Sequence, residues 1–137
     1  MSRQITEKQR VAWAQALSPA GIKRGDLVVT CTEHSYITVG KGRQAYDAYE
    51  LWVAVSVTRE GRIKALRSVR HGDDGYARPL ERISGLKSLT FVPKTQIDID
   101  GAIRAAREHR HSTGHDFAPF STLDEVRDAL RPCLRTN

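Results

Sequence analysis

The chain has 137 residues, of which 39% are hydrophobic and 28% charged, with a formal net charge of +6. This balance favours a single soluble domain over 1–137 and excludes a disordered tail. The longest apolar run, LWVAVSV at 51–57, is too short to cross a bilayer, and the start MSRQITEKQRVAW has no signal-peptide pattern, so we expect a cytoplasmic protein.

The positive charge is concentrated in the first half of the chain. Residues 1–70 hold 12 Lys and Arg against 6 Asp and Glu, whereas residues 71–137 hold 10 of each kind. Such asymmetry favours a polyanionic partner on one side of the molecule, although an excess of arginine also serves solubility. The two cysteines, Cys31 and Cys133, are too few for a disulfide framework, and we expect both to be reduced.

Residues 1–22 are predicted to form an N-terminal helix and its connection. The helix covers ITEKQRVAWAQAL at 5–17 and ends at the breakers SPAG. Its apolar residues fall near one stripe, which predicts that Trp13 is anchored in the core.

Residues 23–92 are predicted to form a β-rich core. Alternating apolar residues indicate strands, and glycine, proline and aspartate mark the turns between them. The expected segments are strands at 27–31, 35–39, 49–57 and 62–70, a mobile loop at 40–49, a loop at 71–79, and one or two short strands within 80–92. The sequence TREG at 58–61 predicts a hairpin between the third and fourth of these strands.

Residues 93–137 change character and are predicted to hold two helices, near 99–110 and after Ser121. Strands grouped between helices argue for an α+β fold with a small antiparallel sheet. The Gly25-Asp26 turn, the strand after it and the long loop that follows resemble the opening of a small SH3-like barrel. A closed sheet therefore stays an alternative to an open one.

The stretch TREGRIKALRSVRHG at 58–72 gathers five basic residues and one acid. In an extended strand, Arg62, Lys64 and Arg70 share one face with Arg59 beside them at the turn, and we expect this row to face solvent. The preceding loop adds Lys41, Arg43 and Tyr46, whose charges and ring suit phosphates and bases. The sequence thus predicts a non-catalytic nucleic-acid-binding protein that contacts mainly the phosphate backbone.

Three other interpretations stay open. Cations on a strand at a sheet edge also block aggregation, without any ligand. A protein-interaction or assembly module, such as a component of a mobile element, would use exposed strand edges, which also permit a homo-oligomer. The resemblance to SH3-like barrels further implies a small endoribonuclease of the toxin kind, with Arg59 and Thr58, or Arg24 and Thr30, in the catalytic roles.

No cofactor, metal or membrane partner is predicted, and neither DNA nor RNA is favoured. The sequence contains no phosphate-binding loop, dinucleotide fingerprint or nucleophile elbow. The cluster HRHSTGH places His109, His111 and His115 close together, but Gly114 interrupts the helical spacing that shared metal coordination would need. We interpret these histidines as solvated residues at a helix end.

Overall fold

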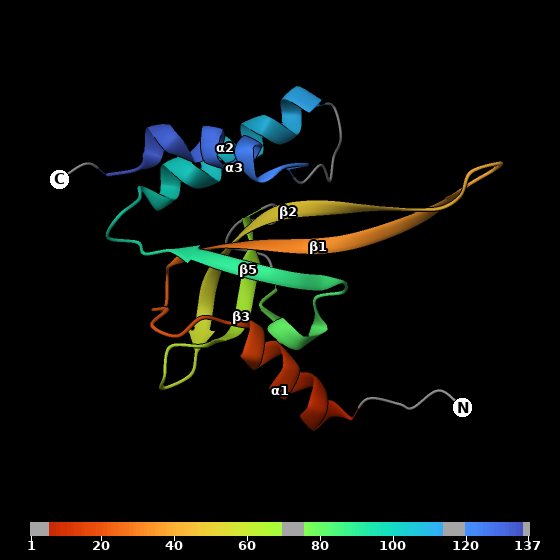
Figure 1. Cartoon of the computed structure of the whole chain (residues 1–137). Helices are drawn as coiled ribbons and strands as arrows, with labels where there is room; N and C mark the ends of the chain where they lie inside the picture. Colours follow the sequence, from red (N-terminus) through yellow and green to blue (C-terminus); the bar gives the residue numbers. More distant parts are fainter. Residues whose placement is uncertain (1–5, 70–75, 114–119, 136–137) are drawn as a thin grey trace.

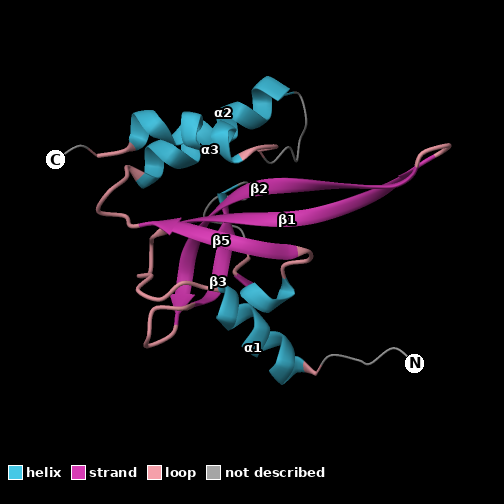
Figure 2. Cartoon of the chain, in the orientation of Figure 1, coloured by secondary structure: helices cyan, strands magenta, loops and turns pink. Residues whose placement is uncertain are grey.

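The computed structural model describes residues 6–69, 76–113 and 120–135, in which an antiparallel sheet follows one helix and precedes two others (Figures 1 and 2). This is the α+β arrangement that the sequence predicts. The helical elements are α1 (Glu7–Leu17), α2 (Ile99–Thr113), α3 (Leu123–Leu130) and the 3-10 turns η2 (Leu80–Arg82) and η3 (Arg131–Cys133). The strands are β1 (Leu27–Thr38), β2 (Gly42–Val57), β3 (Ile63–Ser68), β4 (Arg78–Pro79) and β5 (Leu86–Val92).

The sheet is open, with the strand order β4-β3-β2-β1-β5 and antiparallel pairing throughout the described strands. The predicted hairpin at 58–61 is confirmed, because β2 and β3 pair across it. The alternative of an SH3-like barrel is wrong. The short strand β4 lies at one edge and β5 at the other, so the sheet does not close on itself.

Helices cover both faces of the sheet, so the molecule has three layers (Figure 1). One face packs under α2 and α3, and the other packs against α1 and η2. The first core contains Leu27, Val29, Leu51, Ile97, Phe120 and Val126, and the second contains Ala14, Val28, Trp52, Leu66, Leu80 and Leu86. Alternate residues of β1 and β2 therefore enter different cores, as the two-residue period of a strand requires.

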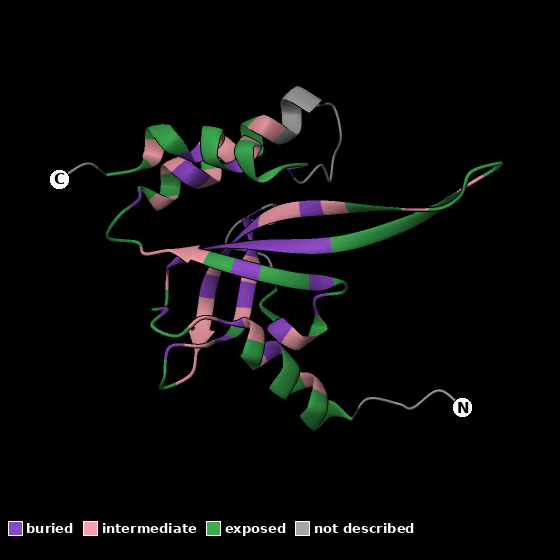
Figure 3. Ribbon diagram, viewed as in Figure 1, coloured by how far each residue is buried: buried purple, intermediate pink, exposed green. Residues whose placement is uncertain are grey.

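The first two strands form one long hairpin that extends beyond both helical layers (Figures 1 and 3). Pairing runs without interruption from Leu27 opposite Val53 to Thr38 opposite Gly42. The prediction of a mobile loop at 40–49 is therefore wrong, because most of this segment belongs to β2. Apolar periodicity is missing there because both faces of the ribbon are exposed, so neither face selects apolar side chains.

The hairpin is held on both edges where it leaves the layers. On the β1 side, the Glu33 amide donates to the Gly85 carbonyl at 2.8 Å. On the β2 side, Tyr49 and Phe120 exchange two backbone hydrogen bonds of 2.8 Å each. Phe120 belongs to the core under α2 and α3, so the root of the hairpin is fixed to that layer.

Trp13 is not the core anchor that the sequence predicts. Its side chain is 49% exposed, and Ala14 is the residue of α1 that is fully buried. The helix packs through Ala14 and Leu17, which are three residues apart and share a stripe that leaves Trp13 at its side.

Candidate nucleic-acid interface

The part of the β1–β2 hairpin beyond Thr32 and Ala48 projects into solvent, and we call residues 33–47 the arm. Its β1 strand continues for six residues past Thr32, a reach of about 20 Å. The apolar side chains at its end are the most exposed: Ile37 at 84% and Val39 at 99%. Exposed apolar residues at the end of a projecting ribbon are typical of a contact surface.

The distal arm carries positive charge only. Residues 34–46 include Lys41 and Arg43 and no Asp or Glu. The Arg43 guanidinium donates to Ser35 Oγ at 3.1 Å, which positions its charge on the exposed face of the ribbon. Gly40 and Gly42 adopt φ values of +86° and +73°, a conformation that glycine reaches without strain, and they form the tight turn that holds Lys41 at the tip.

Aromatic rings gather on the opposite face of the arm. Tyr46 stacks on His34 with ring centroids 5.4 Å apart and lies 5.9 Å from Tyr36 in a tilted arrangement. The Tyr46 side chain is 51% exposed, so this packing leaves part of its ring accessible. The arm therefore offers cations on one face and aromatic surface on the other.

An ion pair neutralises acids at the root of the arm. Lys87 Nζ lies 3.0 Å from Asp47 Oδ1 and 3.7 Å from Glu33 Oε2. The hydrogen bond to Asp47 raises the pKa of Lys87 above its usual value. Both acids of the arm thus face a lysine of β5, and neither lies within the distal segment that holds Lys41 and Arg43.

The structure does not bring all the predicted site residues together. Lys41, Arg43 and Tyr46 lie on the arm, whereas Arg59 and Lys64 are exposed near the β2–β3 turn at the other end of β2. About 45 Å of strand separates the two groups. Arg70 lies outside the described residues.

Arg62 does not belong to a solvent-facing row, contrary to the sequence-based expectation. Its Nη1 donates to the carbonyl oxygens of Gln15 at 3.0 Å and Ser18 at 2.6 Å, at the C-terminal end of α1. Cations favour this end of a helix, where backbone carbonyls lack partners. Irregular pairing between β2 and β3 also shifts the alternation. Leu66 and Ser68, which follow Arg62 and Lys64 at the two-residue spacing of a strand, are therefore buried.

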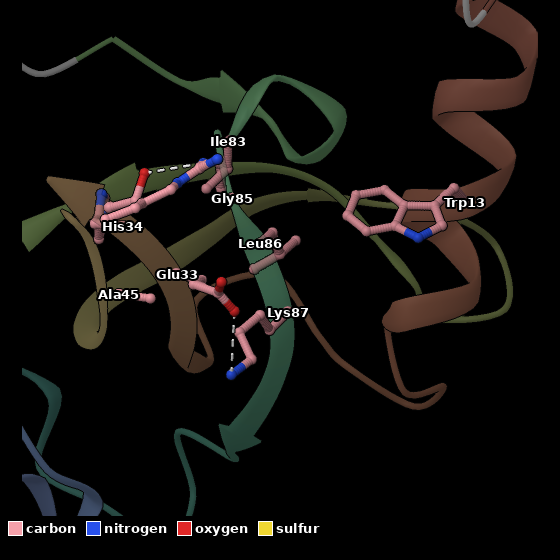
Figure 4. A pocket seen from close by; sticks show the side chains of 10 residues that line it. Trp13, Glu33, His34, Ala45, Ile83, Gly85, Leu86 and Lys87 are labelled. Atoms are coloured by element: carbon pink, nitrogen blue, oxygen red, sulfur yellow. Dashed lines mark hydrogen bonds and ion pairs between the residues drawn. The ribbon is translucent and has the colours of Figure 1, made fainter. Parts of the chain in front are cut away.

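A pocket of about 630 Å³ lies beside the root of the arm (Figure 4). Trp13 faces it from α1, Ile83 and Leu86 line it from the segment that enters β5, and His34 and Arg43 border it from the arm. Sequence reasoning missed the role of Trp13 here. The sequence does contain a second possible apolar stripe on this helix, formed by Ala14 and Leu17. Burial of that stripe leaves the Trp13 indole outside the core.

The two threonine hydroxyls considered for catalysis make hydrogen bonds within the fold. The Thr30 hydroxyl is fully buried and accepts a hydrogen bond from Trp52 Nε1 at 2.8 Å, so it cannot act beside Arg24. The Thr58 hydroxyl accepts from the Arg62 amide at 3.0 Å and stabilises the β2–β3 turn. With the sheet open, the resemblance that suggested a ribonuclease also loses its basis.

Of the three clustered histidines, only His109 has a side chain among the described residues. No group of three His, Cys, Asp or Glu side chains within those ranges could hold an ion. His109 stacks on Phe120, with centroids 4.2 Å apart, and its Nε2 lies 3.8 Å from Glu125 Oε2. The side chain of His111 and all of His115 lie outside the described residues.

Comparisons with known proteins give no assignment: no family model, no curated protein and no solved structure matches the chain. Among the described helices, none combines the length and the apolar character needed to cross a membrane. Any functional conclusion therefore depends on the geometry of the arm and of its surroundings.

Proposed function

We propose that the protein binds nucleic acid through the arm, without catalysis. The observation that supports this proposal is the distal segment 34–46, which is exposed, contains no acid and presents Lys41 and Arg43. Phosphates are contacted by Lys and Arg, and such contacts supply most sequence-independent affinity. A two-stranded ribbon also has the dimensions to enter the major groove of a duplex.

The two faces of the arm have different roles in this proposal. Lys41 and Arg43 contact phosphate oxygens, which sets affinity and its salt dependence. Tyr46 presents its exposed ring to bases or sugars, a contact that tolerates different sequences. We place this function in the cytoplasm, since the thiols of Cys31 and Cys133 are free in the structure and such thiols persist in a reducing compartment.

A titration of labelled oligonucleotides, followed by fluorescence anisotropy, tests the proposal. The variant Lys41→Glu with Arg43→Glu should weaken binding to both duplex and single strands. Its log–log salt slope should be smaller in magnitude by about 2, one for each lost phosphate contact. The matched control is Arg59→Glu with Lys64→Glu, which changes the net charge equally on the exposed β2–β3 side.

The control decides between a specific surface and a general charge effect. Equal losses in both double variants would contradict binding by the arm, and no binding by the unmodified protein at low salt would overturn the proposal. A protein-interaction module would leave the oligonucleotides unbound. A ribonuclease would shorten labelled RNA during the titration, which electrophoresis of the same samples detects.

A further inference from the structure

The outer edge of β1 along the arm has free backbone hydrogen-bonding groups. Pairing of β1 with β5 ends at Thr32, and the Glu33 amide makes the last bond on that side, to Gly85. The backbone N–H and C=O groups of odd-numbered residues in the arm part of β1 point towards this edge, as the Glu33 amide shows. Those of even-numbered residues point towards β2. The N–H and C=O groups of Ser35 and Ile37 therefore point outward, and no described residue pairs with them.

This edge lacks the features that usually prevent strands from pairing between molecules. Natural edge strands carry charges, prolines or bulges. Residues 34–40, HSYITVG, contain none of the charged residue types and no proline, and their pairing with β2 is regular. Tyr, Ile, Thr and Val all favour extended structure. Such a segment at an open edge is a template for another strand.

The geometry of the edge is suited to a second copy of itself. In an antiparallel pairing about a two-fold axis at Tyr36, Ser35 of each copy lies opposite Ile37 of the other. Both residues have outward groups, so each pair exchanges its N–H···O bonds. An axis at Ser35 would instead require the Glu33 amide, which already bonds to Gly85. The axis at Tyr36 therefore uses every free group of this edge.

The exposed tip of the arm agrees with the same arrangement. The pairing brings Val39 of one copy towards the place where Gly85 bonds to the Glu33 amide of the other, beside the pocket that Trp13, Ile83 and Leu86 line. The exposed apolar tip then reaches an apolar surface that it cannot reach within its own chain.

We infer that two copies of the chain associate through the β1 edges of their arms, antiparallel about Tyr36, with each tip seated at the Trp13 pocket of the other copy. The result is a continuous four-stranded ribbon. This association does not depend on nucleic acid. It would nevertheless place the Lys41 and Arg43 of both copies on one ribbon and so double the phosphate contacts that a single arm provides.

Proline substitutions on the two edges of the arm test this inference. Ser35→Pro removes an outward N–H from the β1 edge, and Ala45→Pro removes one from the β2 edge at the position directly opposite. Light scattering coupled to size exclusion should give the unmodified protein twice the 15.3 kDa of one chain. Ser35→Pro should give the mass of one chain, and Ala45→Pro should keep the dimer.

A disulfide test fixes the position of the axis. In a Cys133→Ser background, Tyr36→Cys should form a dimer under mild oxidation, because the two Cα atoms of such a pair lie about 4.5 Å apart, within the disulfide range. Gln44→Cys, on the same face but on β2, should not, because three strand spacings of about 4.8 Å separate its copies.

The outcomes are unambiguous. A monomeric unmodified protein at high micromolar concentration, or a dimer that persists in Ser35→Pro, overturns the inference. Loss of the dimer in both proline variants assigns the contact elsewhere and overturns it as well. Oligonucleotide binding is measured separately on these samples, so failure of the nucleic-acid proposal is distinguishable from failure of the dimer.

Discussion

Arg62 Nη1 lies 2.6 Å from the carbonyl oxygen of Ser18 and joins the β2–β3 hairpin to the end of α1. The same nitrogen donates to Gln15, so one guanidinium satisfies two carbonyls that the helix leaves without partners. Arg62→Met keeps the apolar stem and removes both bonds. We expect the free energy of unfolding to fall by about 1–3 kcal/mol, measured by urea denaturation.

The matched control for this variant is Arg59→Met, three residues earlier and exposed. It removes the same charge and should change stability by less than about 0.5 kcal/mol. Oligonucleotide affinity should stay unchanged in Arg62→Met once the protein is folded. A loss of binding without a loss of stability would show that the guanidinium serves a ligand and not the helix.

The buried hydrogen bond between Trp52 and Thr30 supports the second prediction. Trp52 Nε1 donates to Thr30 Oγ1 at 2.8 Å, and both side chains are buried. Thr30→Val keeps the shape but leaves the indole N–H without its acceptor, which should cost about 1–3 kcal/mol. In a Trp52→Phe background the same substitution should cost much less. Equal costs in the two backgrounds, measured by urea unfolding, would contradict this explanation.

The Asp26 carboxylate connects the start of β1 to the end of β5. Oδ2 accepts from the Lys23 amide at 2.8 Å and Oδ1 accepts from the Lys94 amide at 2.9 Å, and the side chain is buried. Asp26→Asn turns one acceptor into a donor that faces a backbone N–H. We expect a loss of about 1–3 kcal/mol in thermal or urea unfolding. Asp128→Asn, at an exposed ion pair, should change stability by less than about 1 kcal/mol.

The Tyr49 phenol gives a prediction about alkaline pH. The hydrogen bond to the Cys31 side chain, directly opposite on β1, raises the pKa of Tyr49 above the usual value of about 10, and charge on Cys31 and Asp47 adds to the effect. Folding thus favours the protonated phenol. Its contribution to stability is complete below about pH 10 and is lost as pH rises through the folded pKa.

Ultraviolet titration of tyrosinate can measure this shift, with Tyr49→Phe identifying the signal of that residue. In Cys31→Ala the hydrogen bond is absent, and the Tyr49 titration should move to lower pH. If the transition keeps its position in Cys31→Ala, the thiol is not the cause of the raised pKa.

The order of elements was predictable wherever one side of a segment is buried. The β2–β3 hairpin and the helices α2 and α3 show apolar periodicity or clear turn residues, and the structure contains them. The arm was not predictable by that rule, because both of its faces are exposed and its residues carry no apolar alternation. Whether the sheet closes into a barrel was also not predictable from the sequence, because closure depends on whether the two edge strands pair with each other.

The candidate site was only partly accessible from sequence. Lys41, Arg43 and Tyr46 were identified by residue type, and the structure places them on one arm. Arg62 was assigned to solvent because alternation in a strand ignores a neighbouring helix end that needs donors. The position of Trp13 beside the arm depends on how α1 packs, which its alanine-rich sequence does not specify.

The anchoring of the arm has a mechanical consequence. Gly85 holds one edge of the hairpin and Phe120 holds the other, close to the same depth. Phe120 packs in the layer of α2 and α3, whereas the segment before Gly85 packs against α1. The base of the ribbon is therefore attached on both edges, once to each helical layer. A load applied at Val39 reaches both helical layers at once, and the arm cannot swing without straining the body that carries it.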